Sequence, residues 1–244
     1  MFKKNLQFSF AFAFIFIIQL LAETDQGTAK LVLADFHHII KPSITISLMA
    51  YVAFKTQLKG RFAKRIFAGL VFGLFGDIFL MYDYVDPYFF MFGLTSFLIG
   101  HLLYISAFYL DYKWAPSIEK KYTRIAIGVF GVFCVAFYLF LRPYLGDMKI
   151  PVLIYAFVIS LMAIMAVNRK GRVNTISFNL IFYGAILFLI SDSVLAYNKF
   201  VSPVRFAGIW IMATYMIAQY CITIGAIERK LKKHTVIDSE KASA

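Results

Sequence analysis

The sequence predicts an all-α membrane protein, a bundle of eight transmembrane helices, and three observations support this fold class. Hydrophobic residues make up 61% of the 244 residues, whereas charged residues make up only 16%. The apolar residues form eight separate runs, each close to the roughly 20 residues that a helix needs to cross a bilayer. The basic residues lie mainly in alternate gaps between these runs, as expected if those gaps are cytoplasmic loops.

The eight runs leave room only for short loops, so residues 1–228 are expected to form a single transmembrane domain. Helices are expected because lipid cannot satisfy free backbone polar groups, and because the runs lack the two-residue alternation of a membrane barrel. The predicted spans are residues 6–22, 39–55, 65–82, 88–110, 122–141, 150–167, 175–197 and 204–227. Residues 229–244 form a basic and polar tail, which is predicted to be disordered.

The first run also fits a signal peptide. Lys3 and Lys4 precede it, and Leu20 and Ala22 precede a suitable cleavage position. Cleavage there would leave seven spans and would not change the orientation of the rest.

The distribution of charge predicts the orientation of the chain. Most of the 25 Lys and Arg residues lie near the first residues, in the gaps after the second, fourth and sixth runs, and in the tail. Both termini are therefore predicted to be cytoplasmic, and a bacterial protein of this kind would lie in the inner (cell) membrane. The formal charge of +12 does not indicate nucleic-acid binding, because the basic residues are scattered between apolar runs.

The two halves of the chain resemble each other weakly, as two parallel repeats of four helices would. Lys41 and Pro42 open the second run, while Lys149 and Pro151 open the sixth. The third and seventh runs each contain one aspartate at a similar position. Cys134 and Cys221 each lie alone in an apolar run, so neither a disulfide framework nor a zinc site is expected.

Asp77 and Asp192 are the two carboxylates inside predicted spans, and each is followed five residues later by a tyrosine, Tyr82 or Tyr197. Both spans run in the same direction, so the two acids are expected at matching depth. A charged side chain within a span costs about 2.5 kcal/mol or more, and such residues are often functional. If the acids share a site, one would be protonated beside an ionised partner, as acid and base catalysis requires. The alternative is that each acid only links helices by hydrogen bonds.

Other polar residues within the spans are weaker candidates for the same site. His101 and Tyr104 are three residues apart and therefore share a helix face. Ser191 and Gln219 are further polar positions, and all four suit helix-linking hydrogen bonds as well as substrate contacts. No motif for a phosphate loop, a serine nucleophile or a zinc hydrolase is present.

The span ends on the predicted outer side carry residues that suit a lipid headgroup. Lys41, Asn198 and Lys199 could hold a phosphate, and Tyr82 lies in the expected interfacial belt. The alternative for the two lysines is that they extend towards water without a specific ligand.

Three of these segments together resemble the YhhN-like lysoplasmalogenase family of membrane proteins. They are FGDIFLMY (Phe75–Tyr82), FGLTSFLIGHLLYISAF (Phe92–Phe108) and GAILFLISDSVLAYNKF (Gly184–Phe200). The resemblance covers most of the chain, from the second span onward. The acidic residues of the family's GD and SD motifs match Asp77 and Asp192, and the histidine and tyrosine of its GHLLY-like segment match His101 and Tyr104.

The resemblance implies hydrolysis of the vinyl ether bond of a lysoplasmalogen to a fatty aldehyde and glycerophospho-ethanolamine or glycerophospho-choline. It implies Asp77 and Asp192 as catalytic residues, a lysophospholipid substrate drawn from membrane lipids, and no metal or other cofactor. The substrate would contact Lys41, Tyr82, His101, Tyr104, Ser191, Asn198, Lys199 and Gln219. A small proton-coupled transporter or a non-catalytic lipid-binding protein remains an alternative, because parallel repeats with intramembrane acids also occur in carriers.

Overall fold

Each of the eight predicted apolar runs forms a helix in the computed structural model, which describes residues 2–23, 37–116, 118 and 120–232. The helices are α1 (Phe2–Ala22), α3 (His37–Thr56), α4 (Arg61–Met81), α5 (Pro87–Trp114), α6 (Lys121–Leu141), α7 (Lys149–Val167), α8 (Thr175–Phe200) and α9 (Ala207–Ile227). Two short 3₁₀ turns, Arg142–Tyr144 and Gly146–Met148, join α6 to α7. The prediction of an all-helical protein is confirmed, and the described residues contain no β-strand.

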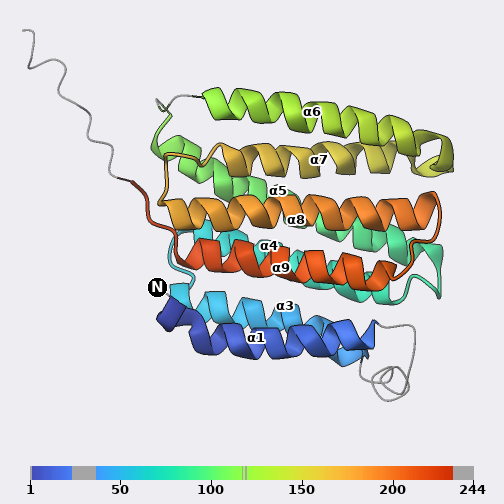
Figure 1. Ribbon diagram of the computed structural model, residues 1–244, viewed down its shortest axis with the longest axis horizontal. Coiled ribbons are helices and arrows are strands. Elements are labelled where there is room, and N and C mark those ends of the chain that lie inside the picture. The colour runs from blue at the N-terminus through green and yellow to red at the C-terminus, as the bar shows by residue number, and fades with distance from the viewer. Residues whose placement is uncertain (1, 24–36, 117, 119, 233–244) are drawn as a thin grey trace, which may run out of the picture.

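The helices lie side by side, and helices that follow one another in the chain run in opposite directions (Figure 1). One end of the bundle, here called the terminal end, contains the start of α1, the end of α9 and the connections 57–60, 115–120 and 168–174. The other end, here called the distal end, contains the connections 82–86, 142–148 and 201–206. Helix α4 packs against α5, and α8 against α9, while α5 and α7 join the two halves.

The ends of the helices follow from local sequence. Asp86 begins α5 as its N-cap, since its side chain accepts a hydrogen bond from the Tyr88 amide, and Pro87 occupies the first helical turn. Gly60, with φ of 86°, separates α3 from α4, and Gly171, with φ of 83°, lies between α7 and α8. Such positive φ angles favour glycine, so these residues terminate the helical path.

The protein is an integral membrane protein. Six of the helices described, α1 and α5 to α9, are long and apolar enough to cross a bilayer. The remaining two are less apolar: α3 contains Lys41 and Lys55 together with several Ser and Thr residues, and α4 contains Arg61, Lys64 and Arg65. Helix α6 exposes a column of aliphatic residues, including Ile125, Val129, Val132, Val135 and Leu139, which is the surface expected to face lipid.

Glycines allow the closest approaches between helices. A Cβ atom on Gly69 would lie 2.3 Å from Cε1 of Tyr104, so α4 and α5 approach too closely there for any larger residue. A Cβ on Gly184 would lie 3.0 Å from the Ala218 carbonyl oxygen, where α8 meets α9. Small residues at such crossings are the usual means of packing membrane helices, because van der Waals contact supplies much of their attraction.

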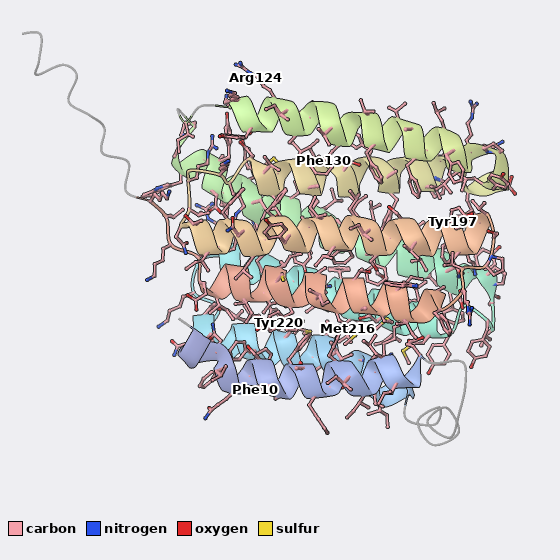
Figure 2. The ribbon with its side chains drawn as sticks, in the orientation of Figure 1. Phe10, Arg124, Phe130, Tyr197, Met216 and Tyr220 are labelled. Carbon is pink, nitrogen blue, oxygen red and sulfur yellow. The ribbon has the colours of Figure 1, made fainter. Side chains whose placement is uncertain are left out.

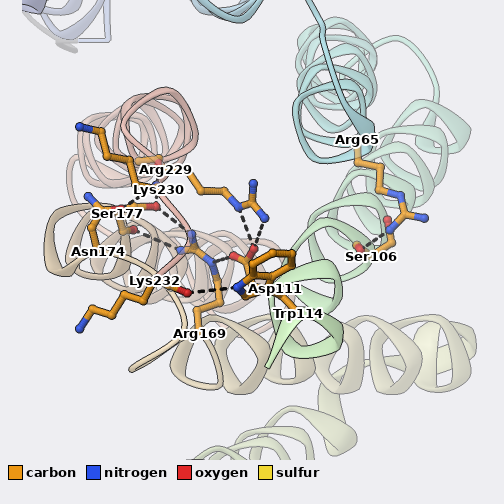
Figure 3. Close-up of polar contacts among 11 residues, drawn as sticks. Arg65, Ser106, Asp111, Trp114, Arg169, Asn174, Ser177, Arg229, Lys230 and Lys232 are labelled. Carbon is orange, nitrogen blue, oxygen red and sulfur yellow. Dashed lines mark hydrogen bonds and ion pairs between the residues drawn. The ribbon is translucent and has the colours of Figure 1, made fainter. Parts of the chain in front are cut away.

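A buried charged cluster ties the helices together at the terminal end (Figure 3). Asp111, which is fully buried near the end of α5, accepts hydrogen bonds of 2.7 Å from Nε of both Arg169 and Arg229. Arg169 also donates to the Ser177 hydroxyl on α8 at 2.8 Å. The cluster therefore joins α5, α8, the connection after α7 and the residues after α9.

The residues just after α9 are ordered by this cluster and by a backbone bridge. Val173 and Leu231 form an antiparallel β-bridge, and Trp114 donates a hydrogen bond to the Lys232 carbonyl. The prediction of a disordered tail is therefore wrong for residues 228–232, because their charged and backbone groups find partners in the 172–174 connection and in Asp111. Residues 233–244 lie outside the described part of the chain.

Helix α1 packs on α3 and α9 through polar as well as apolar contacts. Asn5 donates to Glu228 at 2.9 Å and accepts from the Tyr51 hydroxyl at 2.5 Å, and the hydroxyls of Ser9 and Tyr220 share a hydrogen bond of 2.5 Å. Figure 2 shows Tyr220 on the side of α9 that faces these helices. Helix α1 is thus joined specifically to the bundle.

Candidate active site

Asp77 lies deep in the bundle, in a hydrogen-bonded group formed by residues of α3, α4, α5 and α9. Its side chain is buried, and Oδ2 accepts hydrogen bonds from Thr45 of α3 at 3.0 Å and from Tyr215 of α9 at 2.8 Å. Gln219 donates to the Tyr215 hydroxyl at 3.2 Å and accepts from Tyr104 at 2.7 Å. The carboxyl group is therefore partnered, as a buried polar group must be.

Asp192 forms a second group with two residues from other helices. Tyr155 of α7 donates to Asp192 Oδ2 at 2.5 Å, and Nε2 of His101, on α5, lies 3.2 Å from the same oxygen. The His101 nitrogen also lies 3.0 Å from the Tyr155 hydroxyl. Three groups able to carry or transfer a proton therefore meet at one carboxylate oxygen.

An apolar cleft reaches this second group between α4, α5, α7 and α8. Asp192 and Tyr155 are the polar residues of its lining, and the Asp192 side chain is 12% exposed. The cleft is narrow: its cavity volume is about 30 Å³, and about 400 Å³ is reached only when the spaces between atoms and the open solvent are included. The apolar lining consists of Leu80, Phe90, Leu94, Phe97, Val152, Leu195, Ala196 and Phe200. A hydrocarbon chain is the kind of ligand that such walls suit.

Aromatic rings lie between the two acid groups. The Phe188 ring contacts His101 edge-on, with ring centroids 4.6 Å apart, and contacts Tyr215 in the same way at 5.3 Å. Phe97, which lines the cleft, also packs against Tyr215 at 5.8 Å. Asp192 therefore borders the cleft, whereas Asp77 accepts its hydrogen bonds behind the aromatic wall.

The other residues expected at the site are divided among several locations. His101 joins the Asp192 group, while Tyr104 and Gln219 join the Asp77 group. Lys41 lies one helical turn before Thr45 on α3. Ser191 is buried and donates to the Ile211 carbonyl of α9 at 3.0 Å.

The three remaining residues lie at the distal end. Tyr82 caps the end of α4, and Asn198 accepts a hydrogen bond from the Val204 amide at 2.8 Å, which fixes the turn after α8. Lys199 forms an ion pair of 2.9 Å with Asp83. Lys199 also lies close to the cleft lining, because its ammonium is 4.8 Å from the ring centroid of Phe90.

Sequence reasoning did not place Thr45, Tyr155 or Tyr215 at the site, although each donates a hydrogen bond to one of the acids. Each occupies an apolar run in which an isolated hydroxyl gives no signal of its own. Among the described residues, no three His, Cys, Asp or Glu side chains come together as metal ligands would.

The sequence is similar to those of known proteins. A sequence model of the YhhN family matches residues 36–226. The chain is 33% identical to the lysoplasmalogenase TMEM86A of Bos taurus over 69% of this chain and 67% of that protein. It is 29% identical to the human lysoplasmalogenase TMEM86B over 71% and 68% of the two chains, and 26% identical to a lysoplasmalogenase of Mycobacterium tuberculosis over 78% and 71%. No solved structure matches the chain.

Proposed function

Since the chain belongs to the YhhN family, we propose that it is a lysoplasmalogenase, which hydrolyses the vinyl ether bond of a lysoplasmalogen. The products are a fatty aldehyde and glycerophospho-ethanolamine or glycerophospho-choline. The observation that carries the proposal is the Asp192, Tyr155 and His101 group at the wall of an apolar cleft. The apolar walls between Asp192 and the distal end suit part of a lipid substrate, and the polar group suits the acid–base chemistry.

The proposed reaction begins when a carboxylic acid protonates the β carbon of the vinyl ether, which produces an oxocarbenium ion. Water attacks this cation and loses a proton, and the hemiacetal that forms collapses to aldehyde and alcohol. Asp192 is the acid in this scheme because it borders the cleft. Its Oδ1 makes no hydrogen bond among the described residues, whereas Oδ2 is held by Tyr155 and His101.

After the proton transfer, Asp192 is a carboxylate and stabilises the neighbouring cation, and it then takes a proton from the attacking water. Tyr155 and His101 hold Oδ2 and so orient the carboxyl group. Asp77 is the second acid of the site and lies behind Phe97 and Phe188. Tyr215 connects it to these rings, because Tyr215 donates a hydrogen bond to Asp77 and packs against both of them. In this proposal Asp192 transfers the proton and Asp77 has a supporting electrostatic role.

We further propose that all eight helices span the membrane and that both termini are cytoplasmic. The charged ends of α3 and α4 lie at the distal and terminal ends of the bundle, where they would reach water by extending along the helix. The polar contacts of Asn5 and Ser9 support retention of α1 rather than cleavage as a signal peptide. In a bacterium the protein would lie in the cell membrane.

Two parallel repeats of four helices are supported by the pattern of hydrogen bonds to the acids. Asp77 receives hydrogen bonds from the second helix of its own half, α3, and from the last helix of the other half, α9. Asp192 likewise contacts α7, the second helix of its half, and α5, the last helix of the other half. A pseudo-two-fold axis along the membrane normal would produce this exchange.

Aldehyde release by detergent-purified protein from lysoplasmenylethanolamine tests the proposed function. Wild-type protein should release aldehyde, and Asp192→Asn should lower kcat by about 10²- to 10⁴-fold, the usual effect of removing a general acid. The exposed Asp147 at the distal end offers a control, Asp147→Asn, that removes one carboxylate without touching the cleft. Absence of aldehyde from folded wild-type protein, with either headgroup, would exclude this function.

A further inference from the structure

An ion pair lies at the distal end of the bundle, beside two residues that line the cleft. Nζ of Lys199 lies 2.9 Å from Oδ2 of Asp83, and the two side chains are 38% and 33% exposed. The same ammonium lies 4.8 Å from the ring centroid of Phe90, and Phe90 packs edge-on against Phe200. Both phenylalanines line the cleft that contains Asp192. The ion pair therefore lies beside the cleft lining at the distal end, where a lipid headgroup would lie if the helices span the membrane as proposed.

The spacing along α8 matches the length of the substrate. Lys199 follows Asp192 by two turns on the same face of the helix, which is about 10 Å along the axis. In a lysoplasmalogen, seven bonds separate the β carbon of the vinyl ether from the phosphorus, or about 8–9 Å in an extended chain. A substrate with its vinyl ether at Asp192 would therefore place its phosphate near Lys199.

We propose that Lys199 and Asp83 together form a subsite that recognises a zwitterionic headgroup. This inference rests on the proposed function, because it uses the position of the vinyl ether at Asp192. Lys199 binds the phosphate, and Asp83 binds the ammonium that follows it by two carbon atoms. Asp83 is thereby a specificity-determining residue for the reaction.

The ion pair is suited to exchange its partners. An exposed pair of this kind contributes little to stability, so separating its two side chains costs little. A phosphoethanolamine or phosphocholine group carries an anionic phosphate and a cationic ammonium at about the spacing of an ion pair. Its binding therefore replaces the single contact between Lys199 and Asp83 with two contacts, Lys199 to the phosphate and Asp83 to the ammonium. A headgroup that ends in a bare phosphate would meet the Asp83 carboxylate without a compensating cation, and Asp83 would disfavour it.

The turn that carries Asp83 also suits a quaternary ammonium group. Tyr84 and Tyr88 are 75% and 70% exposed on the same 82–88 segment. Aromatic rings attract quaternary ammonium groups through the negative charge of their faces. The subsite is therefore expected to accept both ethanolamine and choline and to select against anionic headgroups.

The test compares two alkenyl substrates that differ only in the headgroup. Lysoplasmenylethanolamine is zwitterionic, whereas 1-alkenyl-glycerol-3-phosphate is anionic, and kcat/KM is measured for each in neutral detergent micelles. Wild-type protein should prefer the zwitterion, and Asp83→Asn should lower this preference by about 10-fold, as expected for loss of a charged hydrogen bond. Lys199→Gln should lower kcat/KM for both substrates. Asp147→Asn and Lys149→Gln, which alter exposed charges at the same end, should leave the preference unchanged.

A charge exchange separates substrate recognition from a structural role. The double variant Asp83→Lys with Lys199→Asp keeps an ion pair but reverses its direction. It should lose most turnover of the zwitterion, whereas a purely structural ion pair would preserve it. An equal effect of Asp83→Asn on both substrates, or no effect on either, would overturn the proposal.

Binding without turnover distinguishes failure of the subsite from failure of the proposed reaction. The saturated ethers 1-alkyl-lysophosphatidylethanolamine and 1-alkyl-glycerol-3-phosphate cannot undergo vinyl ether hydrolysis. If wild-type protein releases no aldehyde but binds the first ether more tightly in an Asp83-dependent way, the reaction is wrong and the subsite stands. If it binds both ethers equally, the subsite is wrong whether or not aldehyde is released.

Discussion

Tyr104 donates a hydrogen bond of 2.7 Å to Gln219, and this contact joins α5 of the first half to α9 of the second. The two residues are 115 positions apart. The same interval separates Asp77 from Asp192 and Gly69 from Gly184. In the proposed repeat, Tyr104 and Gln219 would therefore occupy equivalent positions.

Replacing Tyr104 with phenylalanine should weaken this link between the halves. The substitution removes the hydroxyl that donates to the buried Gln219 oxygen. Hydrogen bonds between membrane helices contribute only about 1 kcal/mol on average, so the effect should be modest. We expect a small fall in the midpoint of thermal unfolding in detergent. The double variant Tyr104→Phe with Gln219→Leu should be less destabilised than the sum of the two single variants, because both single variants lose this one contact. Strictly additive effects would contradict this account.

The Tyr155 hydroxyl should be important for catalysis because it fixes the carboxyl group at the cleft wall. Tyr155→Phe keeps the ring but removes the hydrogen bond of 2.5 Å to Asp192. Hydrogen bonds to charged groups contribute about 1.5–3 kcal/mol, so kcat should fall about 10- to 100-fold. The measurement is aldehyde release at saturating substrate. Tyr183→Phe, at an exposed tyrosine on α8, is the matched control and should retain wild-type kcat; similar rates for both variants would exclude the role of Tyr155.

The extent of the helices could largely be predicted from the sequence, because uninterrupted apolar runs are a direct consequence of a lipid environment. The predicted spans end too early where a helix continues through a charged residue. Helix α5 extends to Trp114 and so includes Asp111, and α8 extends to Phe200 and so includes Lys199. Burial of Asp111 depends on arginines from two other segments, and a single run of sequence contains no information about those partners.

The site was predictable only as a set of candidates. Intramembrane acids stand out by their cost in lipid, so Asp77 and Asp192 could be selected from the sequence. Helical periodicity placed His101 and Tyr104 on one face, but these two residues contact different acids. Which helix faces which neighbour is decided by packing of the whole bundle, and periodicity within one helix cannot determine it.

Asp111→Asn should destabilise the terminal end strongly. Burial lowers the pKa of Arg169 from its usual value, and Asp111 opposes that shift. Asp111 therefore stabilises the charged form of this buried guanidinium. Removing one partner of a buried ion pair lowers the free energy of unfolding by about 3–5 kcal/mol. We expect a clear fall in the unfolding midpoint and in the yield of folded protein. Asp147→Asn, which removes an exposed carboxylate, should change neither quantity.

Two glycine-to-alanine variants should have opposite effects on stability. On Gly69 the added Cβ would lie 2.3 Å from the Tyr104 ring, so α4 and α5 would have to separate at a position that also supports the Asp77 group. Overpacking of this kind typically costs about 1–3 kcal/mol.

On Gly128 of α6 a Cβ would meet nothing within 4 Å. Alanine there should leave stability unchanged or raise it by about 0.5–1 kcal/mol, since it reduces the freedom of the unfolded chain without a clash. Unfolding midpoints of both variants in the same detergent provide the measurement. Equal changes in stability for the two substitutions would show that the close α4–α5 crossing at Tyr104 does not determine the effect at Gly69.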